Sequence, residues 1–143
     1  LELHLLNKKS NKISPDIRPG VNTLKSFLDN NVDIVYALEC SVYSDILKAA
    51  GTCDFFGVMR DVPVVGDYKS MRTPKKREWI TDYFIQATFY SFAIWELTGI
   101  FPRAVIIMMT TPGGERRVYW ERPKEWIGQT KKLIDDFHTG EHI

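Results

Sequence analysis

Apolar and polar residues alternate along this chain in two periods, one typical of strands and one typical of helices. The pattern predicts a helix over 21–30, three strands over 32–43, 50–59 and 62–70, a long helix over 78–98, two strands over 104–109 and 115–121, and a helix from Pro123. The first six residues resemble the tail of another helix. This order of elements predicts an α/β domain, a mixed sheet with helices on its faces that bury the apolar run at 104–109.

The strands over 50–59 and 62–70 are separated only by the polar pair Arg60-Asp61, which predicts a β-hairpin. If the strands pair about this turn, Asp67 lies opposite Asp54. Lys69 shares a face with Asp67, because alternate residues of a strand point the same way. Two carboxylates and an ammonium group would then converge. The alternative is an ordinary salt bridge between strand neighbours.

Oxygen ligands of this kind suit Mg²⁺ or Mn²⁺, which keep several waters and take one or two protein carboxylates. A lysine beside such an ion can orient or deprotonate an attacking water and offset charge on a phosphoryl group. Asp54, Asp67 and Lys69 are therefore candidates for a metal-assisted hydrolytic site, with the salt bridge as the alternative that these residues alone leave open.

The long helix carries a stripe of residues at three-to-four spacing, namely Trp79, Tyr83, Gln86, Tyr90, Ala93 and Leu97. Gln86 and Tyr90 are one turn apart and are expected on one face. Such a stripe can be an aromatic core contact. The amide within it needs a further reason, which contact with the site would supply.

Three motifs occur in order: Gly51-x-x-Asp54, Asp67-x-Lys69 followed by Ser70, and Gln86-x-x-x-Tyr90. This ordered set resembles the RecB-like branch of the PD-(D/E)XK nuclease superfamily, and within it the group of phage and mitochondrial genome maintenance exonucleases. The resemblance covers about 39–99 well and the flanks loosely.

The resemblance implies a restriction-endonuclease-like core with a mixed sheet of about five strands, and a metal-dependent DNA exonuclease. Asp54, Asp67 and the backbone carbonyl of Tyr68 would bind Mg²⁺, for which Mn²⁺ can substitute. Lys69 would position the attacking water, and Gln86 and Tyr90 would hold the DNA strand. The implied substrate is DNA with free ends or single strands, in DNA processing, repair, recombination or replication.

Two further acids are candidate metal ligands. Glu2 fits the glutamate that follows a motif histidine in the first helix of the resembled family; that histidine would precede Leu1, and His4 is expected to be a surface residue. The expected single domain over 1–143 would then lack part of its first helix. Glu39 lies among apolar residues of a predicted strand, so it needs a cationic partner, which a metal or a structural Lys or Arg could provide.

A basic segment follows the Asp67-x-Lys69 strand directly, with Arg72, Lys75, Lys76 and Arg77 within six residues. Its position beside the predicted metal site suits contacts to DNA phosphates. A solvated loop is the alternative. Because the net charge of the chain is only +1, any DNA contact must be local.

The amino-acid composition limits the classes of protein that are possible and leaves the candidate site residues as they are. The hydrophobic content of 44% and charged content of 26% are ordinary for a globular domain, and no apolar run is long enough to span a membrane. Cys40 and Cys53 have neither zinc-type spacing nor the density of a secreted disulfide scaffold, so a reducing interior is expected. With the resemblance to phage exonucleases, we expect the cytoplasm of a bacterium or phage-infected cell rather than a mitochondrion. The rival functions are a structure-specific or restriction-type endonuclease, a non-catalytic DNA-binding relative, and a structural module.

Overall fold

The computed structural model describes residues 24, 27–73 and 75–140. Its centre is a five-stranded sheet in the order β1-β2-β3-β4-β5. The strands are β1 (Val32–Ser44), β2 (Ala49–Met59), β3 (Val62–Ser70), β4 (Ala104–Thr110) and β5 (Arg116–Glu121). Only β3 and β4 pair in parallel; the other neighbours are antiparallel. The predicted mixed α/β sheet is therefore confirmed, with strand bounds within one residue of those expected.

The turn between β2 and β3 is the predicted two-residue hairpin. Arg60 and Asp61 have φ angles of 49° and 65°, as a type I′ turn requires at both central residues. The Arg60 amide donates to the Asn31 carbonyl at 3.1 Å, and the Asp61 amide donates to Asp33 Oδ2 at 2.8 Å. The turn is thus docked on the chain that leads into β1, which fixes the β2–β3 register.

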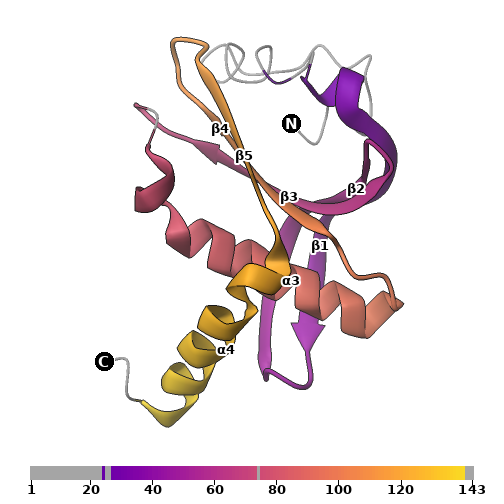
Figure 1. The fold of residues 1–143 in the computed structure, drawn as a ribbon, viewed down its shortest axis with the longest axis vertical. Helices are drawn as coiled ribbons and strands as arrows, with labels where there is room; N and C mark the ends of the chain where they lie inside the picture. Colours follow the sequence, from indigo (N-terminus) through magenta and orange to yellow (C-terminus); the bar gives the residue numbers. More distant parts are fainter. Residues whose placement is uncertain (1–23, 25–26, 74, 141–143) are drawn as a thin grey trace.

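Helices cover the two faces of the sheet (Figure 1). The long helix α3 (Thr81–Thr98) packs on one face over a core that includes Phe84, Ala93 and Val65. On the other face Leu24 and Leu28 pack against Phe55, Met59, Val64, Ile106 and Met108. Every residue of 105–110 is buried, as expected for a central strand with both faces covered.

Helix α3 begins later than its sequence pattern predicts. Arg77–Trp79 forms a short 3₁₀ helix, η1, and the α-helix begins at Thr81. Ile80 separates the two with φ −122°, and its side chain is buried in the core. The end is as predicted, because Gly99 adopts the left-handed conformation and its amide donates to the Trp95 carbonyl at 2.9 Å.

The predicted stripe of α3 is only partly the buried face. Tyr90 and Ala93 are buried, whereas Gln86 and Leu97 are exposed, and Trp79 lies on η1 with 65% of its surface exposed. Aromatic residues occupy every side of this helix, so periodicity alone could not identify the face that packs on the sheet.

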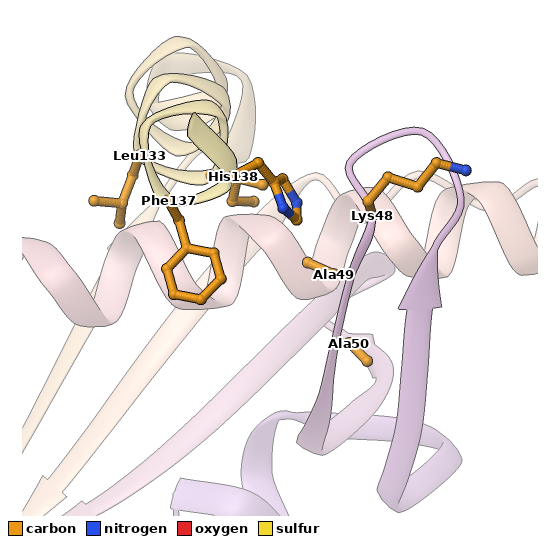
Figure 2. A pocket seen from close by; sticks show the side chains of 7 residues that line it. Lys48, Ala49, Ala50, Leu133, Phe137 and His138 are labelled. Atoms are coloured by element: carbon orange, nitrogen blue, oxygen red, sulfur yellow. The ribbon is translucent and has the colours of Figure 1, made fainter. Parts of the chain in front are cut away.

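Helix α4 (Pro123–Thr139) packs on α3 through its N-terminal half, where the Trp126 and Phe84 rings lie 5.3 Å apart. Its C-terminal half extends past the sheet (Figure 1). There the apolar side chains of Leu133 and Phe137 are 49% and 63% exposed. They line an open cavity of about 360 Å³ beside the β1–β2 turn at Lys48 (Figure 2). None of the helices within the described ranges is long and apolar enough to cross a membrane.

Candidate functional site

Asp54 and Asp67 come together at the point where β2 and β3 separate. The paired register runs from the turn to Phe55 opposite Gly66, and the next step places Asp54 opposite Asp67. The Tyr68 amide donates to Asp54 Oδ2 at 2.9 Å. The Asp54 side chain thus takes the hydrogen bond that the backbone of β2 would otherwise accept, and this holds its carboxylate against β3. The predicted juxtaposition of the two acids is present.

Asp67 is a buried carboxyl group, with only 4% of its surface exposed. Lys69 Nζ lies 3.1 Å from Asp67 Oδ2, so both residues lie on one side of β3 as predicted. The pKa of Asp67 is raised to about 7, first by burial and then by the hydrogen bond with the neighbouring Asp54 carboxyl, while the Lys69 ammonium opposes the rise. Within the described part of the chain, the buried Asp67 Oδ2 has this ion pair with Lys69 and no further hydrogen bond.

This donor set fits a small divalent cation. Two carboxyl groups in contact repel each other when both are ionised, and a shared proton or a cation removes the repulsion. The buried Asp67 Oδ2 has capacity for one more strong contact. Within 24, 27–73 and 75–140, however, no group of three or more His, Cys, Asp or Glu residues could hold a metal. Two carboxylates with waters match the coordination habits of Mg²⁺.

Lys69 is held from its other side by an aromatic ring of α3. Its Nζ lies 4.8 Å from the centroid of the Tyr83 ring, and its side chain is 28% exposed. The ammonium group therefore sits between a carboxylate and a π face, both of which favour its charge. The sequence placed Tyr83 in the aromatic stripe of the helix but gave no reason to link it to Lys69, because the two belong to different elements.

Gly51 and Tyr90 meet by direct packing. A Cβ added to Gly51 would lie 2.7 Å from Tyr90 Cε1, closer than side chains tolerate. Tyr90 is 6% exposed, and its pKa is raised to about 12, first by burial and then by the Asp67 carboxylate. The first and third motifs therefore contact each other beside the two acids. Gln86, one turn earlier, is exposed, so its predicted contact with DNA stays a prediction.

Glu39 lies beside Asp54 along the sheet. The register pairs Leu38 with Phe55 and Cys40 with Cys53, and this places Glu39 opposite Asp54. Its φ angle is 45°, and it is exposed. Its predicted roles as a metal ligand or a salt-bridge partner stay predictions, as does that of the Tyr68 carbonyl. Glu2 and His4 lie outside the described residues.

The alternation of side chains between the two faces of the sheet is interrupted in β2. Cys53 and Phe56, three residues apart on β2, both pack in the core beneath α3. Strict alternation would place them on opposite faces. The interruption falls at Asp54, next to the positive φ of Glu39. Sequence reasoning missed this irregularity, because neither residue is a glycine or a proline that would mark it.

One of the four cations of the basic segment, Arg77, contacts side chains of other elements. Arg77 forms a salt bridge with Glu121 and lies 5.2 Å from the Tyr119 ring centroid and 5.6 Å from that of Phe84. These contacts link η1 to β5, and because the Arg77 side chain is 47% exposed, its contact with DNA phosphates stays a prediction. Arg72, Lys75 and Lys76 are exposed, consistent with either alternative left open by the sequence.

Comparison with known proteins identifies similar folds but no family. No protein-family model matches the chain, and no curated protein matches it. Among solved structures, a protein from Eubacterium rectale named "Putative exonuclease" aligns with a TM-score of 0.51 and 13% identity, over 97% of this chain and 73% of that one. The protein SSO0001 aligns with a TM-score of 0.47 and 17% identity, over 94% of this chain and 63% of that one. The likeness to the first protein agrees with the α/β fold.

Proposed function

We propose that this chain is a metal-dependent deoxyribonuclease of the RecB-like PD-(D/E)XK type that acts as an exonuclease. The observation that carries the proposal is the buried Asp67 carboxyl group, which lies beside the carboxyl group of Asp54 and whose Oδ2 is 3.1 Å from Lys69 Nζ. One ammonium group does not neutralise two adjoining carboxylates, so a bound cation would stabilise the pair. The likeness in fold to a protein named as an exonuclease supports the same class.

Asp54 and Asp67 are the residues that would hold Mg²⁺, and the ion would supply charge neutralisation at the scissile phosphate and its leaving oxygen. Other residues of the chain orient these catalytic groups. The Tyr68 amide orients the Asp54 carboxylate, and the Tyr83 ring orients the Lys69 ammonium. Lys69 would donate a hydrogen bond to the attacking water, whose oxygen forms the new bond to phosphorus as the bond to the 3′ or 5′ oxygen breaks; the water gives up one proton to solvent, and the leaving oxygen takes one from solvent.

The experiment is degradation of end-labelled single-stranded and double-stranded DNA with Mg²⁺, Mn²⁺ or EDTA. The wild type is expected to shorten the DNA only with metal, and Lys69→Ala to reduce the rate at least 100-fold. Lys132→Ala is the matched control, because Lys132 also pairs with an aspartate, Asp136 at 3.2 Å, but lies on the exposed side of α4. Its rate should equal that of the wild type.

A supercoiled circular substrate separates the exonuclease from an endonuclease. An exonuclease leaves the closed circle intact, whereas a restriction-type or structure-specific endonuclease linearises or nicks it. Substantial cutting by Lys69→Ala, with its fold unchanged by circular dichroism, would contradict the role assigned to the lysine. DNA binding without cleavage by the wild type would favour the non-catalytic relative.

A further inference from the structure

Trp79 is a large exposed aromatic residue on an element that is fixed at both ends. It is the last residue of η1, and 65% of its surface is exposed. Before it, Arg77 is bound to Glu121 and lies over two aromatic rings. After it, Ile80 is buried in the core, and its amide donates to the Arg77 carbonyl at 3.2 Å. The indole is therefore presented to solvent from a rigid support.

Pairs of a cation and an aromatic ring occur both at the candidate site and at this indole. Lys69 Nζ, beside Asp67, lies 4.8 Å from the ring centroid of Tyr83. Tyr83 follows Trp79 by four residues, and Lys76 Nζ lies 5.4 Å from the Trp79 ring centroid. Because the indole remains largely exposed, Lys76 covers only part of it. Ammonium groups that bind phosphates and rings that stack on bases are the two components of a single-strand binding surface.

We propose that Trp79 stacks on an unpaired base of single-stranded DNA next to the cleavage site, while Lys76 contacts a neighbouring phosphate. This inference rests on the proposed nuclease function and adds a residue that selects the form of the substrate. A base within a duplex has both faces covered by its neighbours, so an unpaired base offers the indole a face that the interior of a duplex does not. Trp79 thereby favours single strands and frayed ends over intact duplex.

The test measures binding of a fluorescein-labelled 12-nucleotide single strand and of the matching blunt duplex, with Ca²⁺ in place of Mg²⁺ to hold the carboxylates without turnover. Trp79→Leu, which keeps an apolar side chain but removes the ring, should weaken single-strand binding roughly 5- to 100-fold. Binding of the duplex should change less than about twofold. Trp79→Phe, which keeps a smaller ring, should bind the single strand with an affinity between those of the wild type and Trp79→Leu.

Trp95→Leu is the matched control, because Trp95 is 46% exposed on α3 but packs against Phe92 and Phe101 near the far end of that helix. It should leave both affinities unchanged. A second readout uses a single strand with one 2-aminopurine. Wild type should quench its fluorescence on binding at one position near the end, and Trp79→Leu should abolish the quenching.

The outcomes distinguish this inference from the proposed function. If the wild type degrades DNA with metal but Trp79→Leu binds single strands as tightly as the wild type, the stacking role is overturned and the nuclease stands. An equal loss of single-strand and duplex binding also overturns it, because stacking on an unpaired base cannot weaken both alike. If the wild type neither binds nor cuts any DNA, both the nuclease and the stacking role fail.

Discussion

Replacing Asp67 by Asn should stabilise the metal-free protein at alkaline pH and, under the proposed nuclease function, abolish cleavage. Burial of Asp67 beside Asp54 raises its pKa from 3.8 to about 7, so the folded protein binds this proton more tightly than the unfolded chain does. Its stabilising contribution is therefore complete below pH about 4 and is lost as the pH rises through about 7. Above that pH the fold carries a buried, partly uncompensated charge that asparagine lacks.

The size of the effect follows from the shift in pKa. A rise of about three units corresponds to about 4 kcal/mol of free energy of unfolding between the protonated and ionised limits. Most of that difference in the free energy of unfolding arises between pH 4.5 and pH 8. The stability of Asp67→Asn minus that of the wild type should thus increase by about 3 kcal/mol over this range.

The assay is urea unfolding followed by far-ultraviolet circular dichroism in EDTA at pH 4.5, 6, 7 and 8. Asp135→Asn is the control, since Asp135 is an exposed aspartate on α4, and its difference from the wild type should stay nearly constant with pH. Mg²⁺ should restore stability to the wild type and not to Asp67→Asn, because only the wild type keeps both carboxylates. A pH-independent difference for Asp67→Asn, or a loss of stability at pH 8, would refute the reasoning.

Two further predictions concern the packing that holds the site. Gly51→Ala forces its Cβ against Tyr90 Cε1, which lies only 2.7 Å from the built position, and should cost about 1 to 3 kcal/mol by chemical denaturation. Combining it with Tyr90→Leu should cost less than the sum of the single changes; strict additivity would show that the contact is absent. Glu96→Ala removes the acceptor of Ser44 Oγ at 2.5 Å and of the Asp45 amide at 2.9 Å, and should lower the stability by about 1 to 3 kcal/mol. An unchanged melting temperature would exclude that role for Glu96.

The sequence predicted the parts of the site that depend on local chain geometry. The pair Arg60-Asp61 specifies a two-residue turn, and a turn of known length sets the register of both strands that it joins. That register places Asp54 opposite Asp67, and the alternation of β3 places Lys69 beside Asp67. The fold class followed in the same way, from the order and spacing of the elements.

Other parts depend on contacts between distant elements, which no local pattern reveals. Arg77 of the basic segment forms a salt bridge with Glu121 on β5. This partner becomes a neighbour only after β4 and β5 have formed. The start of α3 is delayed because Ile80 is buried in a non-helical conformation. The alternation of side chains between the two faces of the sheet is interrupted at Asp54 in β2, where a regular strand would continue it. In each case tertiary packing overrides a correct local preference.

The three sequence motifs are joined by contacts that also explain why they occur together. Gly51 leaves room for the Tyr90 ring, so the first motif limits what the helix can place over β2. Asp54 accepts the Tyr68 amide, so the same strand that carries Asp67 and Lys69 orients the opposing acid. Tyr83 on α3 holds the Lys69 ammonium. Changing one motif therefore disturbs the position of another. A variant at Gly51, which carries no functional side chain, should lower metal affinity, because a displaced Tyr90 ring would press on the buried carboxyl groups beside it.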